Sequence, residues 1–303
     1  MFFSDHKKKA NADEGKGKYS DIRDTGIIFE GGGLRGIFAA GVIDYFLDND
    51  IIFKNVIGVS AGACHACSYV AGQRGRSYAV STDYLDDKRY MSFENLRKTG
   101  DLFGSDFIYH KIPEELYPLD NEAFKKSGIS FWAGVTNCET GFPEYLQIKD
   151  LFEDVDMVRA SSSLPMLANM VEINGNLYMD GGIADSIPVE ASEEMGFKKN
   201  VVVLTRPVGY RKEKEKMIKL VQARYGKYPE MVKALRFRDR IYNETMDHID
   251  EGVENGTIFR IAPVKDLGIG RLEKNKNKLK LAYEEGYFVA EAMAEKLKEF
   301  LDK

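Results

Sequence analysis

The sequence predicts an α/β fold in three layers, α/β/α, with helices on both faces of a mainly parallel sheet. Short apolar runs alternate with helical patterns along most of the chain, which is typical of βαβ units. Two of these runs end in glycine-rich turns that lead directly into helices. Because 44% of the 303 residues are hydrophobic and 30% are charged, the chain can bury a sizeable core and is not disordered as a whole.

The predicted elements follow one another in a regular order. The first strand, 26–29, ends in Glu30 and three glycines, and apolar residues at helical spacing predict a helix over 37–47. The second strand, 53–59, and a helix over 61–73 repeat this unit. Apolar runs and turn signals then predict strands at 129–136, 144–148, 170–173, 177–179, 200–205 and 257–262. Helices are expected at 155–163 and 188–195, within 210–254, and over 279–301.

Composition divides the chain into three segments. Residues 1–24 are rich in lysine but lack the apolar core of a secretory signal, so we expect a flexible polar tail. The α/β pattern and all the motifs described below lie in 25–205. Residues 206–303 are mostly helical in pattern and strongly charged, and we expect them to form an extension packed on the α/β unit.

Charge and cysteine content exclude several classes of protein. The net charge is −5 and no basic run lacks neighbouring acidic residues, so no nucleic-acid partner is expected. Charged residues interrupt the apolar stretches well short of the about 20 residues that cross a bilayer. The three cysteines, Cys64, Cys67 and Cys138, form no disulfide framework, which favours a cytoplasmic location. Cys64 and Cys67 have no second ligand pair at zinc-like spacing, so no metal is expected.

Ser60 is the candidate nucleophile. It is the centre of a G-x-S-x-G motif between Gly58 and Gly62, after a predicted strand and before a predicted helix. A sharp turn at this point exposes the serine hydroxyl, and the helix start places backbone N–H groups beside it. The same five residues could also form a tight corner where a strand and a helix pack closely.

A glycine-rich loop between the first strand and the first helix is the second signal. Consecutive glycines let several backbone N–H groups face one point, which suits the oxyanion of an acyl-transfer intermediate. We favour a structural role for the arginine of this loop over contact with an anionic head group. The loop consists of Gly31, Gly32, Gly33, Leu34, Arg35 and Gly36.

The same loop also matches the G-x-G-x-x-G pattern of a dinucleotide site, which would give it a different function. That site requires an acidic residue at the end of the next strand. Asp48 and Asp50 precede the strand that begins at Phe53, and Ser60 is the residue that follows it. The order of these residues therefore argues against a nucleotide cofactor.

Asp180 is the candidate general base. It follows a predicted hairpin strand and precedes Gly181 and Gly182, although an aspartate in an ordinary β-turn would look the same. Because a free aspartate has a pKa of about 3.9, burial must raise its basicity. A triad with His248 has the right chain order, but His248 lies in a charged helical stretch. His65 cannot easily reach back to Ser60, and His110 has no convincing setting, so a Ser60–Asp180 dyad is the simpler hypothesis.

Together these motifs resemble the patatin-like phospholipase family. The segment 159–165 also resembles the family, and the likeness covers about 26–204, while the last hundred residues more weakly resemble the C-terminal extension of a bacterial branch. The resemblance implies a Ser60–Asp180 dyad, an oxyanion hole formed by the backbone amides of Gly32, Gly33 and Leu34, and hydrolysis of lipid acyl esters. It also implies that no metal or nucleotide is needed.

The resulting prediction is a serine acyl hydrolase whose partner is a lipid or fatty acyl ester. A non-catalytic acyl- or lipid-binding protein on the same scaffold is the alternative, and peripheral membrane contact stays open. A crowded apolar stretch could cover the acyl chain as a lid or could be ordinary core packing. Its residues are Leu102, Phe103, Phe107, Ile108, Tyr109, Ile112, Leu116, Tyr117 and Phe124.

Overall fold

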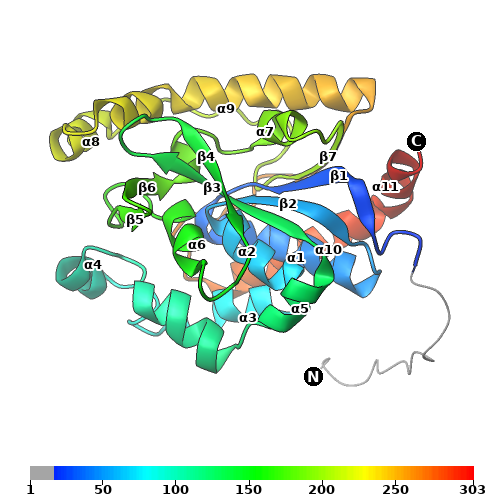
Figure 1. Cartoon of the computed structure of the whole chain (residues 1–303), viewed down its shortest axis with the longest axis horizontal. Helices are drawn as coiled ribbons and strands as arrows, with labels where there is room; N and C mark the ends of the chain where they lie inside the picture. Colours follow the sequence, from blue (N-terminus) through cyan, green and yellow to red (C-terminus); the bar gives the residue numbers. More distant parts are fainter. Residues whose placement is uncertain (1–16) are drawn as a thin grey trace.

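A computed structural model describes residues 17–303 and shows a central sheet of eight strands flanked by helices (Figure 1). The strands are β1 (Ile22–Phe29), β2 (Phe53–Val59), β3 (Ser130–Asn137), β4 (Pro143–Ile148), β5 (Val171–Ile173), β6 (Asn176–Asp180), β7 (Lys199–Val203) and β8 (Ile258–Ile261). Their order is β5-β6-β3-β2-β1-β7-β8, and β4 also pairs with β3. Strands β3, β2, β1, β7 and β8 pair with one another in parallel. Strands β4 and β6 pair antiparallel with β3, and β5 pairs antiparallel with β6. The predicted α/β fold with a mainly parallel sheet is confirmed.

Helices of both the first and the last parts of the chain surround this sheet. They are α1 (Ile37–Asp48), α2 (Ala61–Val70), α3 (Arg76–Thr82), α4 (Phe93–Thr99), α5 (Asn121–Ser127), α6 (Val155–Ser161), α7 (Val189–Glu194), α8 (Ile218–Tyr225), α9 (Pro229–Asn255), α10 (Lys276–Ala292) and α11 (Ala294–Leu301). Three shorter or irregular helical segments are η1 (Gly33–Gly36), η2 (Phe107–Leu116) and η3 (Gly181–Ile183).

The two faces of the sheet bury alternate residues of each central strand. Ile27 and Phe29 of β1 belong to the core that includes α1 and α2, whereas Ile28 between them packs with Tyr242 and Met246 of α9. This alternation follows from the two-residue period of a strand. Figure 1 shows the same division, with α7 and α9 on one side of the sheet and α1, α2 and α10 on the other.

The C-terminal part of the chain is built into this architecture. Strand β8 extends the sheet in parallel beside β7, and α10 packs closely along α1. A Cβ on Gly41 of α1 would lie 2.0 Å from the carbonyl oxygen of Tyr283, and one on Gly286 of α10 would lie 2.0 Å from that of Phe38. Only glycine allows the two backbones to approach so closely. The division of the chain at 205/206 stays a prediction.

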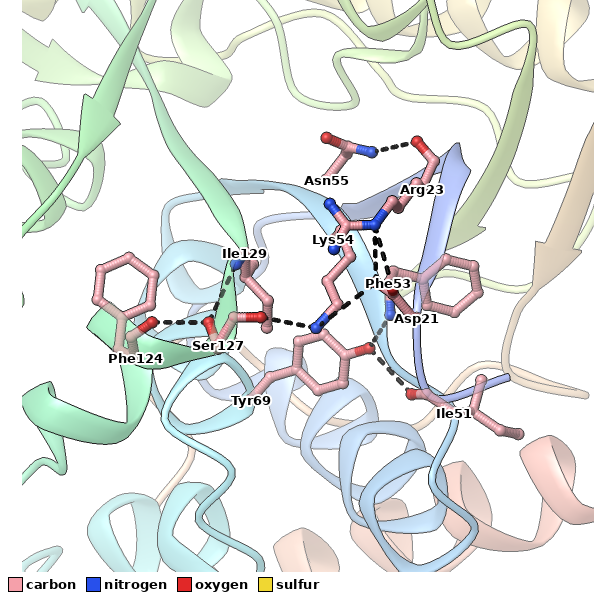
Figure 2. Close-up of polar contacts among 10 residues, drawn as sticks. All are labelled: Asp21, Arg23, Ile51, Phe53, Lys54, Asn55, Tyr69, Phe124, Ser127 and Ile129. Atoms are coloured by element: carbon pink, nitrogen blue, oxygen red, sulfur yellow. Dashed lines mark hydrogen bonds and ion pairs between the residues drawn. The ribbon is translucent and has the colours of Figure 1, made fainter. Parts of the chain in front are cut away.

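Polar contacts anchor the amino-terminal end of β2, as Figure 2 shows. The Tyr69 hydroxyl of α2 accepts a hydrogen bond from the N–H of Phe53 at 2.8 Å and donates one to the carbonyl oxygen of Ile51 at 3.0 Å. The Lys54 ammonium donates to the carbonyl oxygen of Ser127 at 2.7 Å. The far end of α2 is thereby tied to the start of β2, so the turn that joins them at Ser60 is fixed from both sides.

Most predicted elements lie within a few residues of the observed ones, and the differences are local. Strand β1 begins at Ile22, inside the expected tail, and residues 1–16 of that tail lie outside the described residues. The helical pattern over 210–254 divides into α8 and α9, because the chain turns between Tyr225 and Pro229. Within 17–303 no helix is both long and apolar enough to span a bilayer.

Candidate active site

Ser60 lies at the sharp turn between β2 and α2. Its backbone has φ 55° and ψ −126°, a strained conformation for a residue with a side chain. A Cβ on Gly58 would lie 2.5 Å from the Cα of Ala63, and one on Gly62 would lie 2.2 Å from the carbonyl oxygen of Phe29. Both glycines are therefore required by close backbone contacts, and the turn has the geometry expected of the motif.

Asp180 meets Ser60 from the end of β6. The Ser60 hydroxyl donates a 2.6 Å hydrogen bond to Oδ2 of Asp180, and the N–H of Gly182 donates to Oδ1 at 2.8 Å. Asp180 is only 1% exposed, so it is not a surface turn residue. Burial raises the pKa of its carboxyl, and the Ser60 hydrogen bond and the nearby charge of Arg238 partly offset this rise. The two residues predicted to form a dyad are therefore in direct contact.

The end of α6 positions the backbone of both residues. The N–H of Ser60 donates to Oγ of Ser161 at 2.9 Å, and that hydroxyl donates to the carbonyl oxygen of Gly134 at 2.6 Å. The N–H of Asp180 donates to the carbonyl oxygen of Ser163 at 2.9 Å. Ser161 and Ser163 both lie in the segment 159–165. This segment therefore connects β2, β3 and β6 around the Ser60–Asp180 pair.

The glycine-rich loop lies against Ser60. A Cβ on Gly31 would be 2.8 Å from the Cβ of Ser60, so the loop and the serine are in contact. Within 17–303, the N–H groups of Gly32 and Gly33 have no hydrogen-bond acceptor. The N–H of Leu34 differs from expectation, because it already donates to the carbonyl oxygen of Arg271 at 3.1 Å. Of the three amides expected in the oxyanion hole, those of Gly32 and Gly33 are thus without an acceptor in the described chain, whereas that of Leu34 is engaged.

An apolar pocket opens on one side of Ser60 and encloses about 960 Å³ of empty space, including its mouth. Helices α2 and α3 and the segment that includes Phe103, Ile108 and Tyr109 line it. Phe107, by contrast, is buried in the core against Tyr84 and does not line this pocket. The apolar stretch found in the sequence therefore divides, part of it facing the pocket and part of it forming core.

A polar pocket of about 420 Å³ lies on the other side of Ser60. Both pockets share Gly33, Ser60 and Leu164 as lining residues. Most of the charge in the polar pocket comes from the C-terminal segment, which no sequence motif indicated. The cationic side chains that line it are Arg35, Arg206, Lys212, Arg238 and Arg271.

Histidine does not contribute to the Ser60–Asp180 pair within 17–303. His248 lies on α9, where its Nε2 is 3.0 Å from a carboxylate oxygen of Glu193 on α7. His65 lines the apolar pocket, and burial lowers its pKa to about 4. His110 pairs with Glu114. His248 thus contacts Glu193 and has no hydrogen bond to Ser60 or Asp180, which favours the dyad over the triad, and His6 lies outside the described residues.

The structure also places the residues on which a dinucleotide site or a metal site would depend. Asp48 ends α1 and pairs with Arg74, so it lies at the amino end of β2, opposite the edge that carries the glycine loop. A dinucleotide site would need its acidic residue at the other end of this strand. Cys67 donates to the carbonyl oxygen of Ala63 in its own helix. Within 17–303 there is no cluster of three or more histidine, cysteine or acidic residues that could hold a metal ion.

Comparisons with known proteins give two family matches. The family described as "Patatin-like phospholipase" matches residues 27–192, and the one described as "Domain of unknown function (DUF6363)" matches 228–302. The two matches include most residues that line the polar pocket, but Arg206 and Lys212 lie between them.

Three curated relatives and one solved structure are similar to this chain. "Uncharacterized protein YjjU" of Escherichia coli (strain K12) is 28% identical over 80% of this chain and 69% of that protein. "Probable lipid hydrolase 463L" of Invertebrate iridescent virus 6 is 22% identical over 57% of this chain and 65% of its own length. "Lysophospholipase NTE1" of Cryptococcus neoformans var. neoformans serotype D (strain JEC21) is 28% identical over 59% of this chain, but only 11% of that protein is covered. VipD from Legionella pneumophila aligns over 92% of this chain and 67% of its own, with a TM-score of 0.45 and 14% identity.

Proposed function

This chain belongs to the patatin-like phospholipase family, and on that premise we propose that it is a serine hydrolase that cleaves acyl esters of lipids. The observation that carries the proposal is the 2.6 Å hydrogen bond from the Ser60 hydroxyl to the buried carboxylate of Asp180. The relatives named as a lipid hydrolase and as a lysophospholipase support a lipid substrate.

In the first step, Oγ of Ser60 attacks the ester carbonyl carbon while Oδ2 of Asp180 accepts the hydroxyl proton. A carboxylate with a raised pKa is a stronger base than an exposed aspartate, which suits this role. The negative charge that develops on the carbonyl oxygen is stabilised by the open N–H groups of Gly32 and Gly33. The proton held by Asp180 then passes to the leaving alkoxide, and an acyl-serine remains.

In the second step, water attacks the acyl-serine. Asp180 accepts a proton from the water, the same amides stabilise the second oxyanion, and Ser60 leaves with a proton as the fatty acid departs. The apolar pocket beside Ser60 would hold the acyl chain during both steps, with Phe103, Ile108 and Tyr109 on one wall.

Labelling with a fluorophosphonate tests this proposal, because only an activated serine reacts with it. We expect mass spectrometry to find the label on Ser60 of the wild type and on no residue of Asp180→Asn. Ser60→Ala should lose at least about 10³-fold in turnover of a soluble ester with its fold intact, whereas the matched control His248→Ala should keep its turnover.

The competing function is that of a non-catalytic protein that binds acyl chains in the same apolar pocket. Such a protein would bind a fatty acid but would neither take the label nor hydrolyse an activated ester. That combination of results would overturn the hydrolase proposal. We further propose that residues 25–205 form the catalytic unit and that residues 206–303 form an extension packed on it, supported by the pairing of β8 with β7 and of α10 with α1.

A further inference from the structure

We propose that the C-terminal segment completes the site with an anion-binding pocket that recognises a phosphomonoester on the acyl-ester substrate. This inference rests on the proposed function and narrows its substrate class. It also assigns a role to the segment 206–303, most of which matches a domain of unknown function.

The polar pocket has a large excess of positive charge. Its lining holds five cationic side chains and only two carboxylates, those of Glu30 and Asp180. Both carboxylates are already engaged, since Asp180 accepts the Ser60 hydroxyl and Glu30 accepts the N–H of Thr205 at 2.6 Å and the Tyr242 hydroxyl at 2.9 Å. The two carboxylates therefore have hydrogen-bond partners other than the cations, and their two charges offset only part of the five positive ones.

Four of the five cationic side chains lack an ion-pair partner among residues 17–303. Arg206 is the exception, because it pairs with Asp266 at 2.6 Å. Arg35 is only 8% exposed and its Nε has no hydrogen-bond partner, and the buried Nε of Arg238 also has none in the described chain. Lys212 and Arg271 likewise make no ion pair with any described residue. A buried N–H without an acceptor is costly, so the Nε atoms of Arg35 and Arg238 make this pocket suited to an anion that supplies acceptor oxygens.

Mutual repulsion among the cations contributes to lowered pKa values of Arg35 and Lys212. Burial, together with the charge of Arg206, lowers the pKa of Arg35 to about 10. Burial, together with the charges of Arg238 and Arg271, lowers the pKa of Lys212 to about 7. An anion bound among these side chains would relieve the repulsion and favour their charged forms.

A phosphomonoester fits this pocket better than other anions of lipids. It carries about −1.5 to −2 charges and three acceptor oxygens, which match several guanidinium forks and an ammonium. A phosphodiester carries one charge, and a choline or ethanolamine group would bring an ammonium into a cationic pocket. The same five cations also line an adjoining pocket that does not include Ser60, and there Glu213, Glu215 and Asp239 offset part of their charge. None of these three acidic residues lines the pocket that contains Ser60.

The position of the pocket fits the same substrate. Because the apolar and polar pockets meet at Gly33, Ser60 and Leu164, an acyl chain on one side and a phosphoryl group on the other would place the ester carbonyl at Ser60. The same chemistry could attract free inorganic phosphate, so the experiment must distinguish the lipid head group from the free ion.

Calorimetry on Ser60→Ala measures binding independently of hydrolysis. The probes are octanoyl lysophosphatidate, octanoyl lysophosphatidylcholine and monooctanoylglycerol, all below their critical micelle concentrations, and inorganic phosphate. We expect lysophosphatidate to bind at least about 10-fold more tightly than either other lipid. In the Ser60→Ala background, Arg238→Gln and Lys212→Met should each weaken lysophosphatidate binding by about 10-fold and so remove most of this preference. The matched control Arg236→Gln should keep it, since Arg236 is exposed on the same helix and bonds to Gln222.

Three results would overturn the proposal. The three lipids could bind equally well to Ser60→Ala. The preference could survive both Arg238→Gln and Lys212→Met. Inorganic phosphate could lose affinity in these variants while the lipid preference stays unchanged, which would identify a site for a free ion only. Failure of the hydrolase proposal would instead appear as an absence of fluorophosphonate labelling in the wild type, with the affinities of Ser60→Ala unaffected.

Discussion

A methyl group at Gly33 tests whether the glycine-rich loop acts through its backbone amides. Gly33 has φ +57°, and a Cβ there would lie 2.6 Å from the carbonyl oxygen of Arg271 and 3.0 Å from its Cα. Both contacts are with backbone, so the alanine cannot be accommodated by a side-chain rotation. The loop or the segment around Arg271 must shift, and the 3.1 Å hydrogen bond from Leu34 to Arg271 must lengthen.

The size of the effect follows from these contacts. A left-handed conformation costs an L-residue about 1–2 kcal/mol, and loss of one hydrogen bond costs about 1 kcal/mol. We therefore expect the free energy of unfolding of Gly33→Ala to fall by about 2–3 kcal/mol in urea denaturation. If the shift also removes one oxyanion donor, kcat for a soluble ester should fall about 10²–10³-fold.

Gly128→Ala is the matched control for this substitution. Gly128 ends α5 with φ +68°, and its Cβ would have no heavy atom within 4 Å. It should lose about 1–2 kcal/mol of stability through backbone strain alone, with kcat unchanged. Equal kcat values in Gly33→Ala and Gly128→Ala would refute an oxyanion role for the loop.

Three further predictions concern the base, the acyl pocket and the helix packing. Because burial raises the pKa of Asp180, the acid limb of the pH profile of kcat/KM should have a pKa above the ordinary aspartate value of about 3.9. Arg238→Gln should raise this pKa further, because it removes a positive charge that favours the carboxylate. A pKa of the acid limb below about 3.9 would contradict this prediction. Phe103→Ser should raise KM more for long-chain than for short-chain esters, because Phe103 lines the apolar pocket. Phe107→Ser should mainly lower the free energy of unfolding, by about 3–5 kcal/mol, because Phe107 is buried in the core. An equal effect of Phe103→Ser on both chain lengths would argue against acyl-chain binding in this pocket. Gly286→Ala should lower the urea unfolding free energy by about 1–3 kcal/mol, since α1 lies against it, and an unchanged value would show that the helices can separate freely.

The sequence was informative wherever function depends on local backbone geometry. The turn at Ser60 requires glycine on both sides. The hairpin turn has positive φ values of 51° at Asn174 and 79° at Gly175, which asparagine and glycine adopt most easily. Both turns therefore require particular residue types that can be recognised in the sequence. Parallel strands buried on both faces are short and apolar, which is why their limits were predicted within a few residues. The helices between 76 and 127 were not placed, because their polar and aromatic residues show no regular period.

Contacts between distant segments could not be predicted in the same way. Lys212, Arg238 and Arg271 lie far apart in the chain, each among other charged residues, and nothing in their neighbourhoods distinguishes them from surface lysines and arginines. Only the fold, which sets α9 and the loop before α10 beside β1 and β2, brings them to one pocket. The Leu34 amide was assigned to the oxyanion hole for a related reason, since its acceptor on Arg271 is more than two hundred positions away.

Arg271 connects the two parts of the proposed site through different atoms. Its carbonyl oxygen accepts the N–H of Leu34 and lies against Gly33, so its backbone holds the glycine-rich loop in place. Its side chain lines the cationic pocket together with Arg35 of the same loop. An anion that draws the Arg271 side chain inward would therefore act on the residue whose backbone also supports the open amides beside Ser60. The proposed recognition of the charged group and the proposed stabilisation of the oxyanion would thus both depend on Arg271, a residue of the C-terminal segment that pairs with the sheet through β8 and packs on α1 through α10.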